Sequence, residues 1–442
     1  MVWIAGIGLF LATLDTGIIN IALPTLQIAW RTTPAMVAGT VSAYTIALAG
    51  TILFWGRLAD QMGPRRVFWW GLLAFGGASL LCGASWSLEG LIAARAVQGL
   101  ASAMVQGTAI ALATRSVPPQ HRSRAVGTLA LCQGLGPVIG PTVGGLLLTW
   151  TPWRSLFWIN LPITGVLLVW LGRLPQTSAP ETSATSGMDW FGNFLLLVAS
   201  SSGLLALSIH GVSRWYWATI SLLAWIIFVL WERRAKSPLI PRRGWNLPAF
   251  WVGMGAIVVV GGATAIAFMI PPYTMRTWGY IAPWQMGLVN MSAPIMLVLL
   301  SRRASRLLGQ FTPERMMGIG LFLMLMGFIG LAAKTGSPSL LAMIGALGIY
   351  GVGAACFFPA NLVGLLGNFA EDTHGVVGAL QRLSINTGTA IDATVVGNLL
   401  LQRHQVMSQT GMRDGWLYGA ITLMVALAAV EFSRTHRSDQ RR

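Results

Sequence analysis

Charged side chains are scarce in this chain. Only 10% of its 442 residues are Asp, Glu, Lys or Arg, whereas an ordinary soluble domain has roughly 25%. Hydrophobic residues make up 55% of the chain, and the mean hydropathy is +0.66. A single soluble core could not bury so much apolar surface, because cores stop growing near ~250–300 residues. The composition therefore excludes a soluble protein and predicts an all-α, polytopic membrane protein.

The residues that carry metal, redox and nucleotide chemistry are also rare. The three cysteines, Cys82, Cys132 and Cys356, fall in apolar runs without CxxC spacing, so neither a disulfide framework nor a zinc site is expected. None of the five histidines has metal-ligand spacing, and no GxxxxGK[ST] loop occurs, so we expect no metal and no ATP. No nucleophile–base cluster lies at one depth, so we predict that the protein is not an enzyme and has no cofactor.

Acidic residues are fewer than basic ones, with 13 Asp and Glu against 29 Lys and Arg. A nucleic-acid partner would need the basic residues on one soluble face, but here they lie in short loops, where they set topology and meet lipid headgroups. If Met1 is cytoplasmic, 20 of the 29 lie on the cytoplasmic side. The positive-inside rule therefore places both termini in the cytoplasm, which requires an even number of spans.

Apolar runs bounded by charges, Pro or Gly predict fourteen membrane spans. The first is longer than the apolar core of a signal peptide and ends at Pro24 without a small-residue cleavage site, so we expect it to remain as a span. The predicted spans are 2–23, 35–56, 67–86, 88–114, 125–150, 155–172, 190–210, 215–231, 247–270, 284–300, 316–333, 339–366, 375–401 and 415–431.

An internal repeat divides these spans. An offset of 252 residues aligns QGLASA (98–103) with YGVGAA (350–355), and it also aligns Gly136 with Gly388. Two six-span halves related in this way indicate a transporter built from parallel repeats, with its site at their interface. The predicted organisation is a first six-helix bundle, a connector with two additional spans, and a second six-helix bundle with a short basic tail. These parts occupy 1–173, 174–246 and 247–442, and the stretch PQTSAPETSATSG (175–187) reads as a flexible link.

Asp15 is a carboxylate inside the first span, where a charge costs at least ~2.5–3.5 kcal/mol and usually faces a cavity or a partner. Arg95 lies inside the span 88–114. At 1.5 Å per residue both sit roughly 10–12 Å below the outer surface, so they could pair across a central cavity. Asn20 and Gln98 are further candidates for that cavity. The alternative is a permanent ion bridge that only fixes helix packing.

A second carboxylate, Asp392, lies at the same depth in the span 375–401. We predict that it lines the cavity as a second protonatable group or a cation contact. Arg382 is ten residues away on the same span, which is ~15 Å along a helix and too far for a contact. Arg382 is therefore a separate cavity candidate.

The segment GRLADQMGPRR (56–66) combines two glycines with dense charge. Asp60 can cap a helix or meet an Arg of a neighbouring helix, and such bonds can hold one side of a transporter closed. The alternative is a turn that only orients the chain. The residues proposed for this cytoplasmic gate are Gly56, Asp60, Gly63, Arg65 and Arg66.

The span 125–150 carries GLGPVIGPTVGG (134–145). Glycines at a spacing of four allow helices to approach closely, and the two prolines are expected to bend the helix. A helix of this kind suits a domain interface that must stay sealed against ion leak, whereas generic small-residue packing is the alternative. The residues concerned are Gly136, Pro137, Gly140, Pro141, Gly144 and Gly145.

Together these stretches resemble the major facilitator superfamily, in particular its fourteen-span drug–proton antiporters. LDTGIINIALP (14–24) resembles the LDxTIVNVALP signature, GRLADQMGPRR the GxLaDrxGrr loop, and RAVQGLASAM (95–104) the RxxqGxgaa motif. GLGPVIGPTVGG matches the antiporter pattern GxxxGPxxGG, and MDWFG (188–192) fits the opening of the central pair. In the loop, Gln61 and Pro64 depart from the pattern, which predicts weaker bonding there.

The resemblance implies proton or substrate coupling at Asp15, proton handling at Arg95, gating by the loop and exchange through the glycine–proline helix. We therefore predict an antiporter of the bacterial inner membrane that exports lipophilic cations by alternating access. Its energy source would be the proton motive force, through competition of proton and cation for one carboxylate. Its partners would be protons, substrate and membrane lipids, and we expect a monomer. The alternatives are an exporter of a specific metabolite, amino acid or natural product, and a non-transporting membrane sensor.

Overall fold

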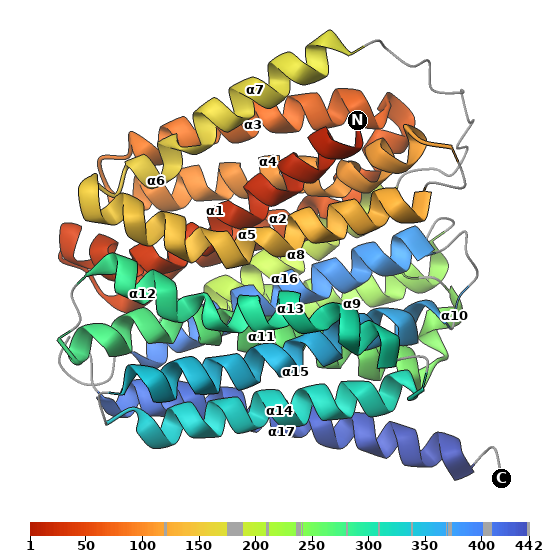
Figure 1. Cartoon of the computed structure of the whole chain (residues 1–442). Coiled ribbons are helices and arrows are strands. Elements are labelled where there is room, and N and C mark those ends of the chain that lie inside the picture. Colours follow the sequence, from red (N-terminus) through yellow and green to blue (C-terminus); the bar gives the residue numbers. More distant parts are fainter. Residues whose placement is uncertain are drawn as a thin grey trace. The chain divides into compact units, whose positions relative to one another are not determined.

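The computed structural model is helical throughout the residues that it describes, and no strand occurs among them. The described residues are 1–118, 122–174, 189–208, 212–235, 240, 242–279, 282–307, 310–336, 339–367, 369, 374–400 and 409–439. The predicted link 175–187 lies outside them. Figure 1 shows the succession of helices along the chain.

The helices are grouped in two units, each with its own interior. The first unit comprises Met1–Thr32 and Met36–Leu239, and the second comprises Thr33–Ala35 and Ile240–Arg442. The first unit holds α1 (Val2–Ala29), α2 (Pro34–Met62), α3 (Pro64–Gly83), α4 (Leu88–Arg115), α5 (Arg122–Trp150), α6 (Ser155–Trp158), α7 (Asn160–Arg173), α8 (Trp190–Ser208) and α9 (Ser213–Arg234). The second holds α10 (Arg242–Trp245), α11 (Pro248–Thr277), α12 (Pro283–Asn290), α13 (Ser292–Leu307), α14 (Pro313–Lys334), α15 (Leu340–Leu366), α16 (His374–Leu399) and α17 (Gln409–Asp439).

Every predicted span coincides with a helix or with two consecutive helices in the described part of the chain. The spans 155–172 and 284–300 are each divided, the first into α6 and α7 and the second into α12 and α13. Among the described residues, ten helices are long and apolar enough to cross a membrane, and two shorter apolar stretches lie at Ile139–Trp150 and Trp284–Leu300. The chain is therefore an all-α polytopic membrane protein, while the number fourteen stays a prediction.

The end of α2 differs from the sequence expectation. The stretch from Gly56 to Met62 continues α2 instead of forming a loop. The chain turns only at Gly63, whose φ of 88° lies in the left-handed region that favours glycine. Pro64 then opens α3 at the first turn, where its missing N–H costs no hydrogen bond. The predicted loop is thus a one-residue break between two helices.

The two units repeat one packing pattern. In the first unit α1 packs on α5, α3 on α4, and α3 on α7; in the second unit α11 packs on α16, α14 on α15, and α14 on α17. The pairs follow each other in the same order along the chain, so the internal repeat that the 252-residue offset indicates is also present in the helix packing. The central helices α8 and α9 pack on each other and belong to the first unit.

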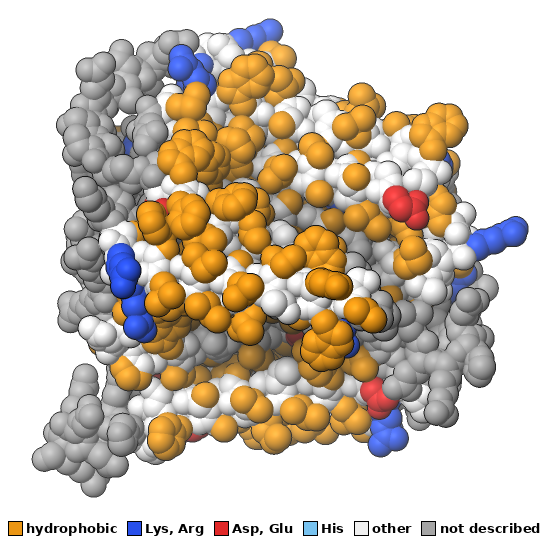
Figure 2. Space-filling view, turned by 180° about the vertical axis from the view of Figure 1, so that it is seen from behind, with side chains coloured by type: hydrophobic (Ala, Val, Ile, Leu, Met, Phe, Trp, Pro, Cys, Tyr) orange, Lys and Arg blue, Asp and Glu red, His pale blue; other side chains and the backbone are white. Residues whose placement is uncertain are grey.

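Apolar side chains cover much of the molecular surface. Figure 2 shows hydrophobic side chains over most of the face in view, with Lys and Arg near its margins. Helix α9 is an extreme case, because Trp215 is 71% exposed and Tyr216 is 70% exposed. Exposed apolar surface of this extent marks contact with a membrane.

Candidate functional site

Glycines on α5 determine which way α1 faces. A methyl group at Gly136 would meet the backbone nitrogen of Leu14 at 2.7 Å, and one at Gly140 would meet Cα of Gly17 at 2.9 Å. Residues 14 and 17 lie on one side of α1 because they are separated by three positions. That side is held against α5, so Asp15 projects from a different side, toward α4 and α7.

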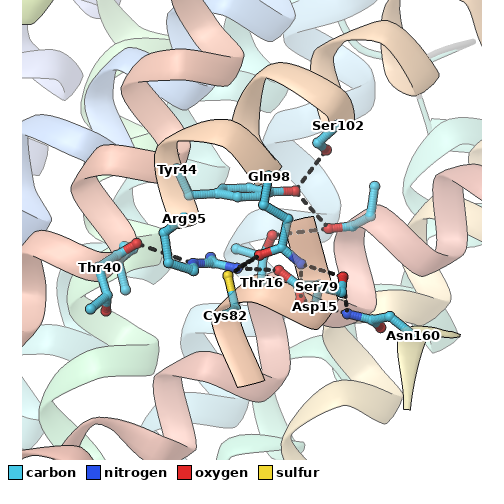
Figure 3. Close-up of polar contacts among 12 residues, drawn as sticks. Asp15, Thr16, Thr40, Tyr44, Ser79, Cys82, Arg95, Gln98, Ser102 and Asn160 are labelled. Atoms are coloured by element: carbon cyan, nitrogen blue, oxygen red, sulfur yellow. Dashed lines mark hydrogen bonds and ion pairs between the residues drawn. The ribbon is translucent and has the colours of Figure 1, made fainter. Parts of the chain in front are cut away.

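Asp15 and Arg95 form a buried ion pair inside the first unit. Nη1 of Arg95 lies 2.5 Å from Oδ2 of Asp15, and the side chains are 0% and 2% exposed. Figure 3 shows the two side chains meeting between their helices. The pairing is direct and leaves no cavity between the two groups, unlike the arrangement that depth alone predicted.

The other carboxylate oxygen of Asp15 accepts hydrogen bonds from two amides. Nε2 of Gln98 donates over 3.0 Å and Nδ2 of Asn160 over 2.9 Å. Both nitrogens also lie within hydrogen-bond distance of Oγ of Ser79, at 2.9 and 3.3 Å. Gln98, Asn160 and Ser79 are fully buried, so this oxygen is held by amides from α4 and α7, and both amides are bonded to Ser79 of α3 (Figure 3).

The guanidinium of Arg95 has a second set of partners. Its Nε donates to the backbone oxygen of Thr40 over 3.2 Å, and its Nη1 also donates to Oε1 of Gln98 over 2.6 Å. The ring of Tyr44 lies under the guanidinium, 4.2 Å from its Cζ, at a distance suited to a cation–π contact. The Tyr44 hydroxyl in turn donates to Oγ of Ser102 over 2.7 Å. The Arg95 guanidinium therefore connects α4, from which it projects, to α2, which carries Thr40 and Tyr44.

Two atoms in the cluster lack a hydrogen-bond partner among the described residues. They are Nη2 of Arg95, a donor, and Oδ1 of Asn160, an acceptor. An unpaired buried polar atom costs about 1–3 kcal/mol. The cluster is therefore not fully satisfied in this conformation, and a rearrangement that supplied partners would recover part of that free energy.

The arrangement joins five helices, α1, α2, α3, α4 and α7, through one ion pair. Removing one charge from a buried pair leaves the other uncompensated, which costs about 3–5 kcal/mol. The ion pair therefore stabilises the packing of these helices, and loss of either charge would weaken it.

Sequence reasoning missed Ser79, Asn160, Thr40 and Tyr44. Asp15 and Arg95 stand out in the sequence because a charge inside a span is costly, whereas a hydroxyl or an amide gives a weaker signal. Ser79 lies four residues before Gly83, the last residue of α3, and Asn160 opens α7 directly after the break that follows α6. Both therefore lie near the same end of their spans as Arg95 does. The depth of these two residues along their spans is thus visible in the sequence, but the helix faces from which they project are not.

The remaining cavity candidates do not join this cluster. Asn20 is 9% exposed on α1 and takes no part in the described hydrogen bonds of Asp15. Asp392 lies in the second unit and is 6% exposed, and its Oδ1 accepts a hydrogen bond from the Tyr418 hydroxyl over 2.9 Å. Arg382 is half-buried on the same helix and is not bonded to Asp392. Their place beside a transport path stays a prediction.

The gate candidates are partly placed. Nη2 of Arg65 donates to the backbone oxygens of Leu171 and Leu174, each over 2.5 Å, and so joins the start of α3 to the end of α7. Gly56 lies inside α2, facing Gly107 of α4. Arg66 is exposed and Gly63 makes the turn. The side chains of Asp60 and Gln61 lie outside the described residues, so the expected Asp–Arg contact is not tested.

The glycine–proline helix packs inside the first unit. Gly136, Gly140 and Gly144 all face α1, and Cδ of Pro141 lies close to Gly17. Gly145 is buried, and the side chain of Pro137 lies outside the described residues. α5 runs without a break from Arg122 to Trp150. This is the close helix approach that generic small-residue packing predicts; the exchange role stays a prediction.

The fold and this cluster define a class: a polytopic membrane transporter made of two helical repeats with a buried ion pair in the first. The Major Facilitator Superfamily matches residues 5–391, and the chain belongs to this family. The "Riboflavin transporter RibZ" of Clostridioides difficile is 26% identical, with 97% of this chain and 96% of the relative covered. The "Putative multidrug resistance protein MdtD" of Pectobacterium carotovorum is 26% identical over 98% and 94%.

A further relative and two solved structures complete the comparison. The "Multidrug resistance protein Stp" of Mycobacterium tuberculosis is 27% identical, covering 89% of this chain and 74% of the relative. A POT family transporter in complex with a thioalcohol-conjugated peptide has a TM-score of 0.72 at 13% identity, covering 98% of this chain and 96% of that one. A D-xylose–proton symporter has a TM-score of 0.69 at 15% identity, covering 97% and 96%. At these identities the structures show the fold alone.

Proposed function

We propose that this protein is a proton-coupled antiporter that exports lipophilic, cationic drugs by alternating access. The membrane is the bacterial cytoplasmic membrane, with both termini on the cytoplasmic side. Two relatives carry drug-resistance names, which supports a drug-like cargo. The observation that carries proton coupling is the fully buried Asp15–Arg95 pair with its shell of amides.

Asp15 serves as the proton site in this proposal. As a carboxylate it is held by Arg95, Gln98 and Asn160; as a carboxylic acid it loses the ion pair and one acceptor site. The two protonation states therefore favour different arrangements of α1, α4 and α7. A ligand shifts a conformational equilibrium only by its differential affinity for the two states, and this cluster gives the proton such a difference.

The coupling runs through Arg95. In the described conformation the carboxylate is only 2% exposed, so a cation cannot replace the proton there until the Arg95 contact opens. We infer that proton uptake frees Arg95, repacks the shared helices and weakens the hold on cargo. Each charge that moves down 100 mV yields ~2.3 kcal/mol, so one or two protons can drive export against a substantial gradient.

The other sequence candidates enter the proposal as follows. Arg65 and the neighbouring residues of the α2–α3 break act at the cytoplasmic gate, and the glycine face of α5 keeps the path sealed during exchange. Asp392, with Asn20 and Arg382, lines the route of the cargo. The central helices α8 and α9 are an additional pair that moves together with the first six-helix bundle.

A second candidate is the export of one specific metabolite. The riboflavin transporter is as similar to this chain, at 26% identity, as MdtD is. A strain that lacks its other drug pumps and expresses this protein separates the two candidates. Resistance to several unrelated cations supports drug export, whereas release of one metabolite without resistance supports the specific exporter.

The decisive test is proton release from the purified protein on addition of tetraphenylphosphonium, a lipophilic cation with a fixed charge. Wild type is expected to release protons in weakly buffered solution, and Asp15→Asn to release none. Glu431→Gln is the matched control, since this carboxylate is exposed and paired on the surface with Arg434. Equal release from wild type and Asp15→Asn would overturn the proposal.

A further inference from the structure

Helix α16 carries a cation without a counterion among the described residues. Arg382 lies eight residues after His374, the first residue of α16, which is about 12 Å into the helix at 1.5 Å per residue. It is half-buried, and in the described part of the chain no acidic side chain and no hydrogen-bond acceptor pairs with it. A guanidinium at this depth normally faces a water-filled space or a partner.

Three other arginines at or near the spans have partners. Arg95 has Asp15, Arg65 has two backbone oxygens at the end of α7, and Arg154 donates to the backbone oxygen of Ser85 over 3.2 Å. Within the described ranges Arg382 has none of these solutions. Its neighbour Gln381 is satisfied, because Nε2 donates to Oδ1 of Asn361 over 2.8 Å. The lack of a partner is therefore specific to the Arg382 side chain, because its neighbour on the same turn of α16 is hydrogen-bonded.

One turn further along α16 a second donor is free. Nδ2 of Asn386 is buried and has no hydrogen-bond partner in the part of the chain that the structure describes. Residues four apart in a helix lie on the same face, so Arg382 and Asn386 present donors side by side. These two donors, a guanidinium and an amide, can bind a ligand group that accepts hydrogen bonds. A guanidinium with a neighbouring amide suits a carboxylate, which accepts two parallel bonds.

We propose that Arg382 and Asn386 form a binding site for an anionic group of the cargo, a carboxylate or a comparable oxyanion. The inference rests on the proposed export function and narrows its substrate class: among lipophilic cations, those that also carry an acidic group are bound most tightly. The acid meets the second unit at α16, while the proton is handled in the first unit. The same donors would also accept a lipid headgroup, and the test below separates the two sources.

The test compares ciprofloxacin, a fluorescent zwitterion, with its methyl ester, which lacks the anion. Binding to the purified full-length protein is followed by fluorescence anisotropy in detergent, without a proton gradient. Wild type is expected to prefer the acid over the ester by about tenfold or more, since charge-assisted hydrogen bonds to a buried group have that value. Arg382→Gln is expected to remove the preference by weakening acid binding alone.

Companion variants distinguish recognition from misfolding. Arg382→Lys keeps the charge and is expected to retain part of the preference, and Asn386→Asp is expected to reduce it by repulsion. Arg303→Gln is the matched control, because this residue lies on α13 in the same unit and is exposed. Repeating the binding in nanodiscs of phosphatidylcholine, with and without phosphatidylglycerol, tests the lipid source.

Two outcomes would overturn the proposal. One is a wild type that does not prefer the acid to its methyl ester, or an Arg382→Gln variant with an unchanged preference. The other is a preference that vanishes when phosphatidylglycerol is added, which would assign the site to a lipid headgroup. Either result leaves proton release by Asp15 unaffected, so failure here differs from failure of the proposed function.

Discussion

The two units share a packing pattern but differ in the residues at corresponding positions. The 252-residue offset places Tyr350 of α15 where α4 has Gln98. In the first unit Gln98 joins Asp15, Arg95 and Ser79. In the second unit the Tyr350 hydroxyl meets Oγ1 of Thr264 over 3.0 Å, and its ring stacks on Phe328 with centroids 5.2 Å apart.

The aromatic cluster continues through the second unit. The ring of Phe328 also meets that of Trp416 on α17 edge-on, with centroids 5.1 Å apart. Around this position the first unit is polar and charged, and the second unit is aromatic. The corresponding position thus carries a polar network bonded to a charged pair in one unit and packed aromatic rings in the other. Under the proposed function, we expect substitutions in the polar network to change proton release and substitutions in the aromatic cluster to leave it unchanged.

The largest expected effect comes from removing the cation of the pair. Arg95→Met should destabilise the protein by about 3–5 kcal/mol, because Asp15 remains buried and unpaired. Unfolding by SDS titration from mixed micelles measures the loss. At the corresponding position of the second unit, Leu347→Met should cost less than about 1.5 kcal/mol.

A double variant sharpens this result. Asp15→Leu combined with Arg95→Met replaces both charges by apolar groups and should recover most of the lost stability. If the double variant were as unstable as Arg95→Met, the pair would not be the source of the cost.

A smaller effect is expected where α5 meets α1. Gly136→Ala introduces a methyl group against Leu14 and Thr13, and such overpacking costs about 1–3 kcal/mol. Because α1 shifts, proton release should fall as well. In the second unit Gly388→Ala meets the backbone carbonyl of Val258 and the backbone nitrogen of Gly262 and should lower stability by at least as much without affecting proton release. Equal proton release from the two variants would contradict the asymmetry.

Replacing the Gln98 amide should again affect proton release, in contrast to replacing its counterpart in the second unit. Gln98→Leu leaves Oδ1 of Asp15 with only Asn160 as a donor among the described residues and should cost about 1–3 kcal/mol. The amplitude of proton release should drop in parallel. Thermal unfolding and proton release on the same preparation test the link, and a stable variant that still lost release would show a purely chemical role for Gln98.

The smallest effect is expected at Tyr350, the position of the second unit that corresponds to Gln98. Tyr350→Phe keeps the ring stack and removes only one hydrogen bond, and Thr264 still donates to the backbone oxygen of Val260 over 2.7 Å. The cost should be about 1 kcal/mol, with proton release unchanged. A loss of proton release in Tyr350→Phe would show that the aromatic half takes part in proton handling.

Much of the fold follows from the sequence by itself. The scarcity of charge requires a membrane protein, and the apolar runs place helices that the structure reproduces, apart from the extension of α2 to Met62. That extension was missed because Arg57 and Asp60 interrupt the hydropathy pattern without interrupting the backbone. Only Gly63, with its positive φ, ends the helix.

The sequence determines how deep each site residue lies along its membrane span. A helix rises 1.5 Å per residue, so counting from a span end puts Asp15 and Arg95 at one level, and the structure brings these two side chains together. The direction in which each side chain points depends on how the helices are rotated and packed, which counting does not give. Tertiary structure alone therefore decided that Asn160 and Ser79 complete the shell of Asp15, that Asp392 meets Tyr418, and that Arg382 has no partner within the described ranges.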